Sequence, residues 1–101
     1  MLVQFSVFPV GAKESLSKEV AKIIDIVDHS GLPYKTTAMA TIVEGSWDEV
    51  MALVKRCHQT MRRANNRVYT SMVIDDRRGA ARRLTGKVDD VEKVLKRKLK
   101  R

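Results

Sequence analysis

Residues 34–49, YKTTAMATIVEGSWDE, carry the clearest local structural signals of the chain. Residues 34–45 are rich in Thr, Ile and Val, which is typical of extended chain, and the segment is long enough to fold back on itself near Ala38–Ala40. A helix start follows, because Ser46 can cap the first turn and Glu49 can return a hydrogen bond to the cap backbone. The stretch therefore predicts a two-stranded hairpin that leads into a helix.

The chain after this stretch predicts the rest of that helix, a strand and a last helix. The pair Asn65–Asn66 suits a helix end, and residues 67–74 then alternate as a strand does. Beyond an Arg-rich and Gly-containing loop, the last helix has acidic residues early and basic residues late, as the helix dipole prefers. The apolar positions that mark the two helices are Trp47, Val50, Met51, Val54, Cys57 and Met61 for the first, and Val88, Val91, Val94, Leu95 and Leu99 for the second.

The chain before this stretch predicts one strand and one helix. Residues 2–9, LVQFSVFP, alternate apolar and polar side chains, the period of a half-buried strand. An amphipathic helix follows and ends at Gly31 and Pro33. Its apolar positions are Leu16, Val20, Ile23, Ile24 and Val27.

The order of these elements predicts an α+β fold of the ferredoxin-like type. Its βαββαβ order gives an antiparallel sheet with both long helices on one face, and an extra C-terminal helix follows. The length of 101 residues suits one domain, so residues 1–101 are expected to form a single unit. No apolar run approaches the roughly 20 residues that span a bilayer, and no signal peptide pattern is present, so we expect a soluble cytoplasmic protein without membrane contact.

The net charge of +8 is distributed unevenly. Residues 1–76 carry nine basic and nine acidic side chains, whereas residues 77–101 carry eleven basic and three acidic ones. This basic segment could bind RNA, DNA or another polyanion, but we favour a solvated helix face and tail over a dedicated nucleic-acid site. The strand TIVEG offers no aromatic side chain on which bases could stack, which also weighs against an RNA-binding domain.

Enzymatic chemistry finds little support in the sequence. Cys57 and His58 are neighbours on a helix and point in different directions, so they do not form a nucleophile and base pair. The lone cysteine excludes an internal disulfide, and no zinc-ligand spacing or glycine-rich phosphate loop occurs. We therefore expect a binding protein that is not an enzyme, with no metal and no cofactor.

The sheet face without helices is the expected binding surface. Its residues are small, hydroxyl-bearing or apolar, which suits contact with a second subunit, a ligand pocket, or a pocket between subunits. At one end of this face, VYTSMVIDDRRG (residues 68–79) places two carboxylates beside two arginines. These charges either pair locally or bind a cationic ligand that Arg77 helps to orient, and the pattern leaves both open. The expected residues of the face are Gln4, Ser6, Phe8, Thr37, Thr41, Val43, Tyr69, Ser71 and Val73.

Three segments together, FSVFPVG, TIVEGSWDEVM and RVYTSMVIDDRRG, resemble the small thiamine-binding protein family. The resemblance spans nearly the whole chain. It implies a ferredoxin-like domain that dimerises and pairs again into a homotetramer, and that binds thiamine or its hydroxymethylpyrimidine portion without catalysis. Such a protein would act as a carrier, store or sensor. An RNA- or polyanion-binding protein and a purely structural oligomer remain the alternatives.

The resemblance also implies which residues contact the ligand. Hydroxyl groups and a carboxylate can hydrogen-bond an aminopyrimidine edge, an acid can balance a thiazolium charge, and Phe8 or Met39 can pack on the ring. Trp47 has a structural alternative as a core anchor, and Glu44 as a partner in local hydrogen bonds. The matching positions are Ser6, Thr37, Thr41, Glu44, Trp47, Ser71 and Asp75, of which Ser6, Thr37, Thr41 and Asp75 are the first choices.

Two departures from the family pattern bear on the ligand. The hairpin tip is Ala38-Met39-Ala40 where relatives commonly have Pro-Met-Gly, and the loss of glycine removes easy access to a positive φ. The basic C-terminal segment suits a phosphate ester better than the thiamine cation itself. The arginines that could contact such a phosphate are Arg77, Arg78, Arg82 and Arg83.

Overall fold

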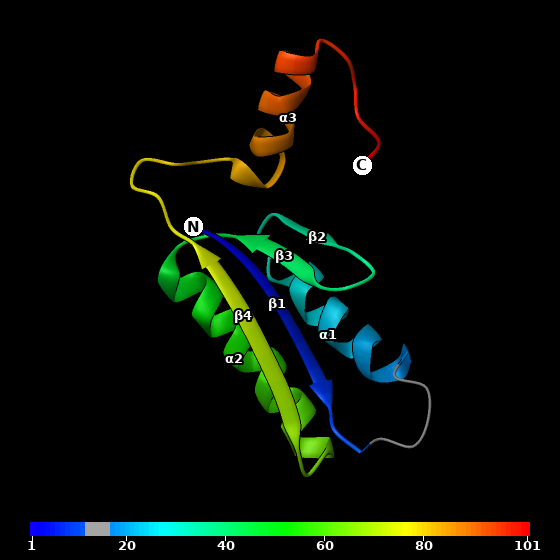
Figure 1. Cartoon of the computed structure of the whole chain (residues 1–101). Coiled ribbons are helices and arrows are strands. Elements are labelled where there is room, and N and C mark those ends of the chain that lie inside the picture. Colours follow the sequence, from blue (N-terminus) through cyan, green and yellow to red (C-terminus); the bar gives the residue numbers. More distant parts are fainter. Residues whose placement is uncertain (12–16) are drawn as a thin grey trace.

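The computed structural model describes residues 1–11 and 17–101 (Figure 1). Leu16, which the sequence places in the first helix, lies outside the described residues. The element order agrees with the prediction. The elements are β1 (Leu2–Pro9), α1 (Ser17–His29), β2 (Tyr34–Thr36), β3 (Thr41–Glu44), α2 (Trp47–Ala64), β4 (Val68–Asp75) and α3 (Arg83–Leu95).

The four strands form one antiparallel sheet in the order β2-β3-β1-β4. β1 lies in the interior and pairs with β4 along its whole length, from Leu2 opposite Asp75 to Pro9 opposite Val68. On its other side β1 pairs with β3. This order and pairing confirm the ferredoxin-like fold.

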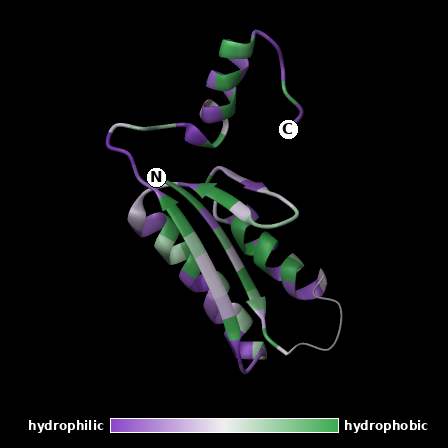
Figure 2. Ribbon diagram, in the orientation of Figure 1, coloured by the Kyte–Doolittle hydropathy of each residue, from purple (hydrophilic) through white to green (hydrophobic). Residues whose placement is uncertain are grey.

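The core lies between the sheet and the two helices α1 and α2, which cover the same face of the sheet (Figures 1 and 2). Alternation in β1 buries every second side chain, so that Val3 and Phe5 are 0% and 2% exposed. Each such side chain contributes roughly 1.5–3 kcal/mol when it leaves water. The buried hydrophobic residues are Val3, Phe5, Val7, Ile23, Val27, Val43, Val50, Leu53, Val54, Cys57 and Met61.

Helix α2 begins with the predicted capping box. The backbone N–H of Glu49 donates to Ser46 Oγ at 3.2 Å, and the N–H of Ser46 donates to Glu49 Oε1 at 2.9 Å. The prediction that Trp47 anchors the core is wrong, because its side chain is 56% exposed and the buried stripe begins one turn later, at Val50. Periodicity identified the buried side of the helix but not how far along the helix the core extends.

The predicted face of two residues in β3 is also wrong. Val43 is paired with Val3 and Thr41 with Phe5, and directly paired residues share a face of the sheet. Thr41 and Val43 therefore face the helices, where they are 6% and 0% exposed. The sequence TIVE has apolar side chains at adjacent positions, so alternation alone did not determine which face they occupy.

Helix α3 stands beyond the end of the strands, apart from α1 and α2 (Figure 1). It contributes no buried residue to the described structure, and Val91 and Leu95 remain 48% and 46% exposed. Lys96 ends the helix in the left-handed region, so Leu99 lies after it and not on it as predicted. In the described residues, no helix has the length and apolarity needed to cross a membrane.

Candidate functional site

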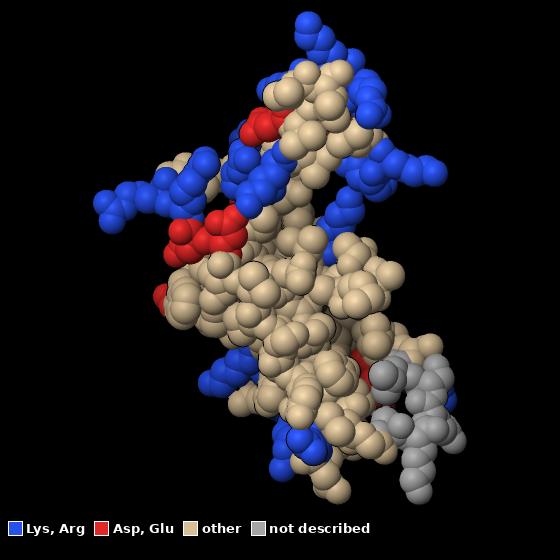
Figure 3. Space-filling model, viewed as in Figure 1, with Lys and Arg blue, Asp and Glu red and all other residues tan. Residues whose placement is uncertain are grey.

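No helix of the described residues covers the sheet face opposite α1 and α2, hereafter the open face. The sheet lies in front of α1 and α2 in the view of Figures 1 and 3, and the surface over it is largely uncharged. Lys and Arg gather instead around α3 and the loop before it (Figure 3). Strand register and burial assign to the open face Gln4, Ser6, Phe8, Ile42, Tyr69, Ser71 and Val73.

Two hydroxyl groups meet at the centre of β1 and β4. Ser6 and Ser71 are directly paired, and their Oγ atoms are 2.9 Å apart. One hydroxyl donates to the other, so the pair still presents one free O–H and unused lone pairs to the solvent side. The pair can therefore both donate to and accept from a polar ring edge.

An aromatic pair lies in the next outward-facing row. The rings of Phe8 and Tyr69 are 5.8 Å apart at an angle of 58°, and the two side chains are 39% and 50% exposed. Arg67 donates to Tyr69 Oη at 2.8 Å, and its guanidinium lies 5.1 Å from the centre of the tyrosine ring. An apolar surface suited to a ligand ring thus adjoins the hydroxyl pair.

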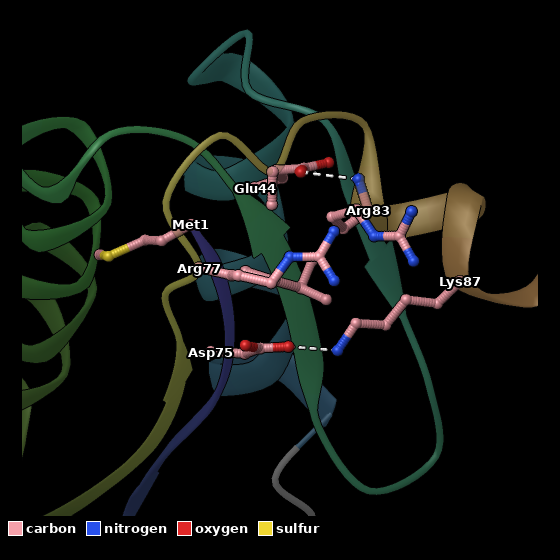
Figure 4. A pocket seen from close by; sticks show the side chains of 8 residues that line it. Met1, Glu44, Asp75, Arg77, Arg83 and Lys87 are labelled. Carbon is pink, nitrogen blue, oxygen red and sulfur yellow. Dashed lines mark hydrogen bonds and ion pairs between the residues drawn. The ribbon is translucent and has the colours of Figure 1, made fainter.

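A pocket of about 160 Å³ lies at the other end of the face, where strands β1, β3 and β4 meet α3 (Figure 4). Leu2 is paired with both Glu44 and Asp75, so this one row of the sheet forms its floor. Its lining residues are Met1, Leu2, Glu44, Asp75, Arg77, Ala80, Arg83 and Lys87.

Glu44 caps helix α3 from the end of β3. Its carboxylate accepts from the backbone N–H groups of Arg83 at 2.7 Å and Leu84 at 3.0 Å. These are two of the N–H groups that a helix start leaves without intrahelical partners, and the positive end of the helix dipole favours a carboxylate there. The N-cap residue Arg82 has φ 54° and makes no side-chain cap of its own. The hydrogen bonds of Glu44 are thus long-range, not local.

Asp75 holds the same helix through Lys87. The two side chains form an ion pair, and the hydrogen bond from Lys87 is the main cause that lowers the pKa of Asp75 below its ordinary value. The charges of Lys87, Arg77 and Arg83 lower it further. At this strand end the carboxylate therefore pairs across to α3 and not with the adjacent arginines.

The hairpin tip is organised by Thr37. Its Oγ1 donates to the carbonyl of Ala40 at 2.9 Å and accepts from the N–H of Ala40 at 3.2 Å. Residues 37–40 use no positive φ, so alanine in place of glycine is accommodated without strain. Met39 is 88% exposed at this tip.

The structure brings some of the predicted site residues together and separates others. Glu44, Asp75 and Arg77 share the pocket. Ser6 and Ser71 lie on the open face, four residues along β1 and β4 from the row that forms the pocket floor. Thr37 and Met39 are at the hairpin tip, and Thr41 faces the helices with its Oγ1 3.5 Å from that of Thr36. Lys87 and Ile42 were not predicted from the sequence, because neither belongs to a motif and only the packing of α3 and the register of β3 place them.

Cys57 lies in the core, and His58 lies at its edge. Burial raises the pKa of the Cys57 thiol to about 11, so the thiol is protonated at neutral pH. His58 Nδ1 lies 2.5 Å from Thr70 Oγ1 and links α2 to β4. Among residues 1–11 and 17–101, no cluster of three His, Cys, Asp or Glu residues could hold a metal ion.

Comparisons with known proteins agree with one another. A family model described as thiamine-binding protein matches residues 3–92. The UPF0045 protein of Mycobacterium bovis is 41% identical over 98 residues, which cover 96% of both chains. A crystal structure of a hypothetical protein from Methanocaldococcus jannaschii superposes with a TM-score of 0.81 at 31% identity, covering 89% of this chain and 93% of that one. A Thermotoga maritima protein, named as a candidate thiamine biosynthesis or salvage protein, has a TM-score of 0.78 at 23% identity over 89% of this chain and 96% of its own, which supports the fold alone.

Proposed function

The chain belongs to the thiamine-binding protein family, and from this premise we propose that it binds thiamine or the hydroxymethylpyrimidine portion of thiamine without catalysing a reaction. The match of the family model over residues 3–92 is the observation that carries the proposal. The protein would serve in the cytoplasm as a carrier, store or sensor of the vitamin.

The open face offers groups that suit the pyrimidine. The amino group and ring nitrogen of an aminopyrimidine need one acceptor and one donor, which the Ser6 and Ser71 pair can supply. The exposed rings of Phe8 and Tyr69 lie beside this pair and can pack against an aromatic ligand. In this proposal the two serines fix the orientation of the ring and the aromatic pair gives apolar contact.

The exposure of the open face supports a site that a second copy completes. Val73 is 65% exposed on the open face, and an apolar side chain of this kind is costly to leave in water. We therefore propose a homo-oligomer, with a tetramer as the expected form, in which a second subunit covers the open face and encloses the ligand.

A thermal-shift series with thiamine and hydroxymethylpyrimidine tests the proposal. A ligand that binds only the folded state stabilises it by about 2.7 kcal/mol at a hundredfold excess over Kd, so the melting temperature should rise with ligand concentration. The double variant Ser6→Ala, Ser71→Ala should raise Kd about tenfold or more, because it removes hydrogen bonds of about 1 kcal/mol each. Gln59→Ala, on the exposed side of α2, is the matched control and should bind like the wild type. The absence of any shift with both compounds would contradict the proposal.

A further inference from the structure

Three cationic side chains converge on the pocket at the end of the open face. Arg77 follows strand β4, and Arg83 and Lys87 come from the first turns of α3. Figure 4 shows the guanidinium of Arg77 extending into the space between Glu44, Arg83 and Lys87. The lining holds these three cations and two carboxylates, and Asp90, outside the lining, pairs with Arg83.

Both carboxylates of the pocket are already engaged. Glu44 accepts from two backbone N–H groups of α3, and Asp75 forms an ion pair with Lys87. The pKa of Asp75 is lowered by that bond, which keeps the carboxylate ionised and paired at neutral pH. Asp75 is therefore paired with a cation, and the oxygens of Glu44 are directed at the backbone N–H groups of α3.

Of the three cations, Arg77 differs from the other two in its partners. The side chain of Arg83 donates to Asp90 at 3.2 Å, and Lys87 is held by Asp75. Among the described residues, Arg77 forms no side-chain hydrogen bond and no ion pair, and it acts on Asp75 only through its charge. Its planar fork of N–H donors matches the oxygens of a phosphate group and can bind two of them at once.

We propose that this pocket receives the phosphate group of a phosphorylated ligand, with Arg77 as its principal contact, so that the protein binds phosphate esters of thiamine in preference to thiamine itself. The inference rests on the proposed function, because the open face must hold the ring system. Lys87 and Arg83 add positive charge on the far side of the phosphate.

The dimensions of the face agree with this arrangement. The Ser6 and Ser71 row lies four residues from the Leu2 and Asp75 row, which is roughly 13 Å at the usual rise of a strand. A ligand whose ring contacts the two serines can extend along the intervening Gln4 and Val73 row and place its ester in the pocket. The volume of about 160 Å³ suits such a terminal group better than a whole two-ring ligand.

Isothermal titration calorimetry with thiamine, thiamine monophosphate and thiamine diphosphate tests the inference. The wild type should bind the esters about tenfold or more tightly than thiamine, since a charge-assisted hydrogen bond contributes this much. Arg77→Ala should bring the ratio of the affinities close to one, and Arg77→Lys should leave an intermediate ratio. Arg78→Ala removes the same charge one residue further along the loop, outside the pocket lining, and should retain most of the preference.

The outcomes separate this inference from the proposed function. Equal affinity for thiamine and its esters in the wild type would overturn the inference and leave thiamine binding intact. Equal effects of Arg77→Ala and Arg78→Ala would also overturn it, because the preference would then come from the general charge of the segment. Binding of none of the three compounds would overturn both proposals. Melting temperatures of the variants within a few degrees of the wild type confirm that each variant is folded.

Discussion

Glu44 ends strand β3 and caps helix α3, although 39 residues separate it from Arg83. The first turn of α3 has no Ser, Thr, Asp or Asn at the N-cap position, where Arg82 stands in the left-handed region. The distant carboxylate replaces the missing local cap. Glu44 thus both stabilises the start of α3 and lines the pocket.

Replacing Glu44 with alanine should release α3 without unfolding the core. The helix loses acceptors for two N–H groups and a favourable charge at its positive end, which together are worth about 1 kcal/mol. Amide hydrogen exchange should become faster at Arg83 and Leu84 while Val54 in α2 keeps its protection. Asp76→Ala removes a neighbouring acid and serves as the control. Unchanged exchange at α3 in Glu44→Ala would contradict the capping role.

The contact of Asp75 with Lys87 should make stability depend on pH. The pKa of Asp75 is lower in the folded state than the value of about 3.9 in an unfolded chain, so the contribution is fully present above that value. It is lost as the pH falls through the folded-state pKa. Urea unfolding at a series of pH values should therefore show wild type more stable than Asp75→Asn at pH 7 and the two converging in strong acid. A constant difference across this range would show that the ion pair does not contribute.

At the scale of the elements, the hairpin tip between β2 and β3 shows how local chemistry shapes a turn. Thr37 Oγ1 bonds the backbone of Ala40 in both directions, and the tip needs no residue with positive φ. Ala38 and Ala40 flank Met39 where relatives commonly have Pro and Gly, and the loss of glycine removes easy access to a positive φ. The structure gives the reason that alanine is compatible here, because the turn closes in conformations open to any residue.

Ala40→Gly should destabilise the protein by about 0.4–1 kcal/mol, because glycine adds conformational freedom to the unfolded chain and the native turn does not use it. Chemical denaturation with a global fit to two states measures the difference. Ala52→Gly, at an exposed position within α2, provides a comparison, with an expected cost of about 1 kcal/mol from helix propensity. A gain in stability for Ala40→Gly would mean that the tip adopts a glycine-type turn.

At the scale of the whole molecule, helices cover one face of the sheet and leave the other face exposed. Helices α1 and α2 enclose the core, whereas the open face and the apolar side of α3 remain in contact with water. Exposed Phe8, Tyr69 and Val73 lie on the same open face, with the Ser6 and Ser71 row between the aromatic pair and Val73. Exposed apolar side chains on one face of a sheet are typical of an interface between protein chains.

Val73→Asp should therefore reduce self-association without unfolding the monomer. A charge placed in an apolar interface cannot keep its hydration, which opposes association, while the position is already 65% exposed in the single chain. Sedimentation velocity should show a smaller species for Val73→Asp than for the wild type. Val20→Asp, 43% exposed on α1 and away from the open face, is the matched control and should sediment like the wild type. A wild type that is monomeric at all concentrations would contradict the proposed oligomer.

The sequence by itself determined the order of the strands and helices, the capping box of α2 and the family, because periodicity, capping chemistry and motifs are properties of short segments. Only the tertiary structure decided that Thr41 and Val43 face the helices, since the register with β1 sets the face of β3. It likewise decided that Glu44 and Asp75 bind α3 and form one pocket with Arg77 and Lys87. These contacts join segments that are distant in the chain. They depend on how complete elements pack, which no local pattern encodes.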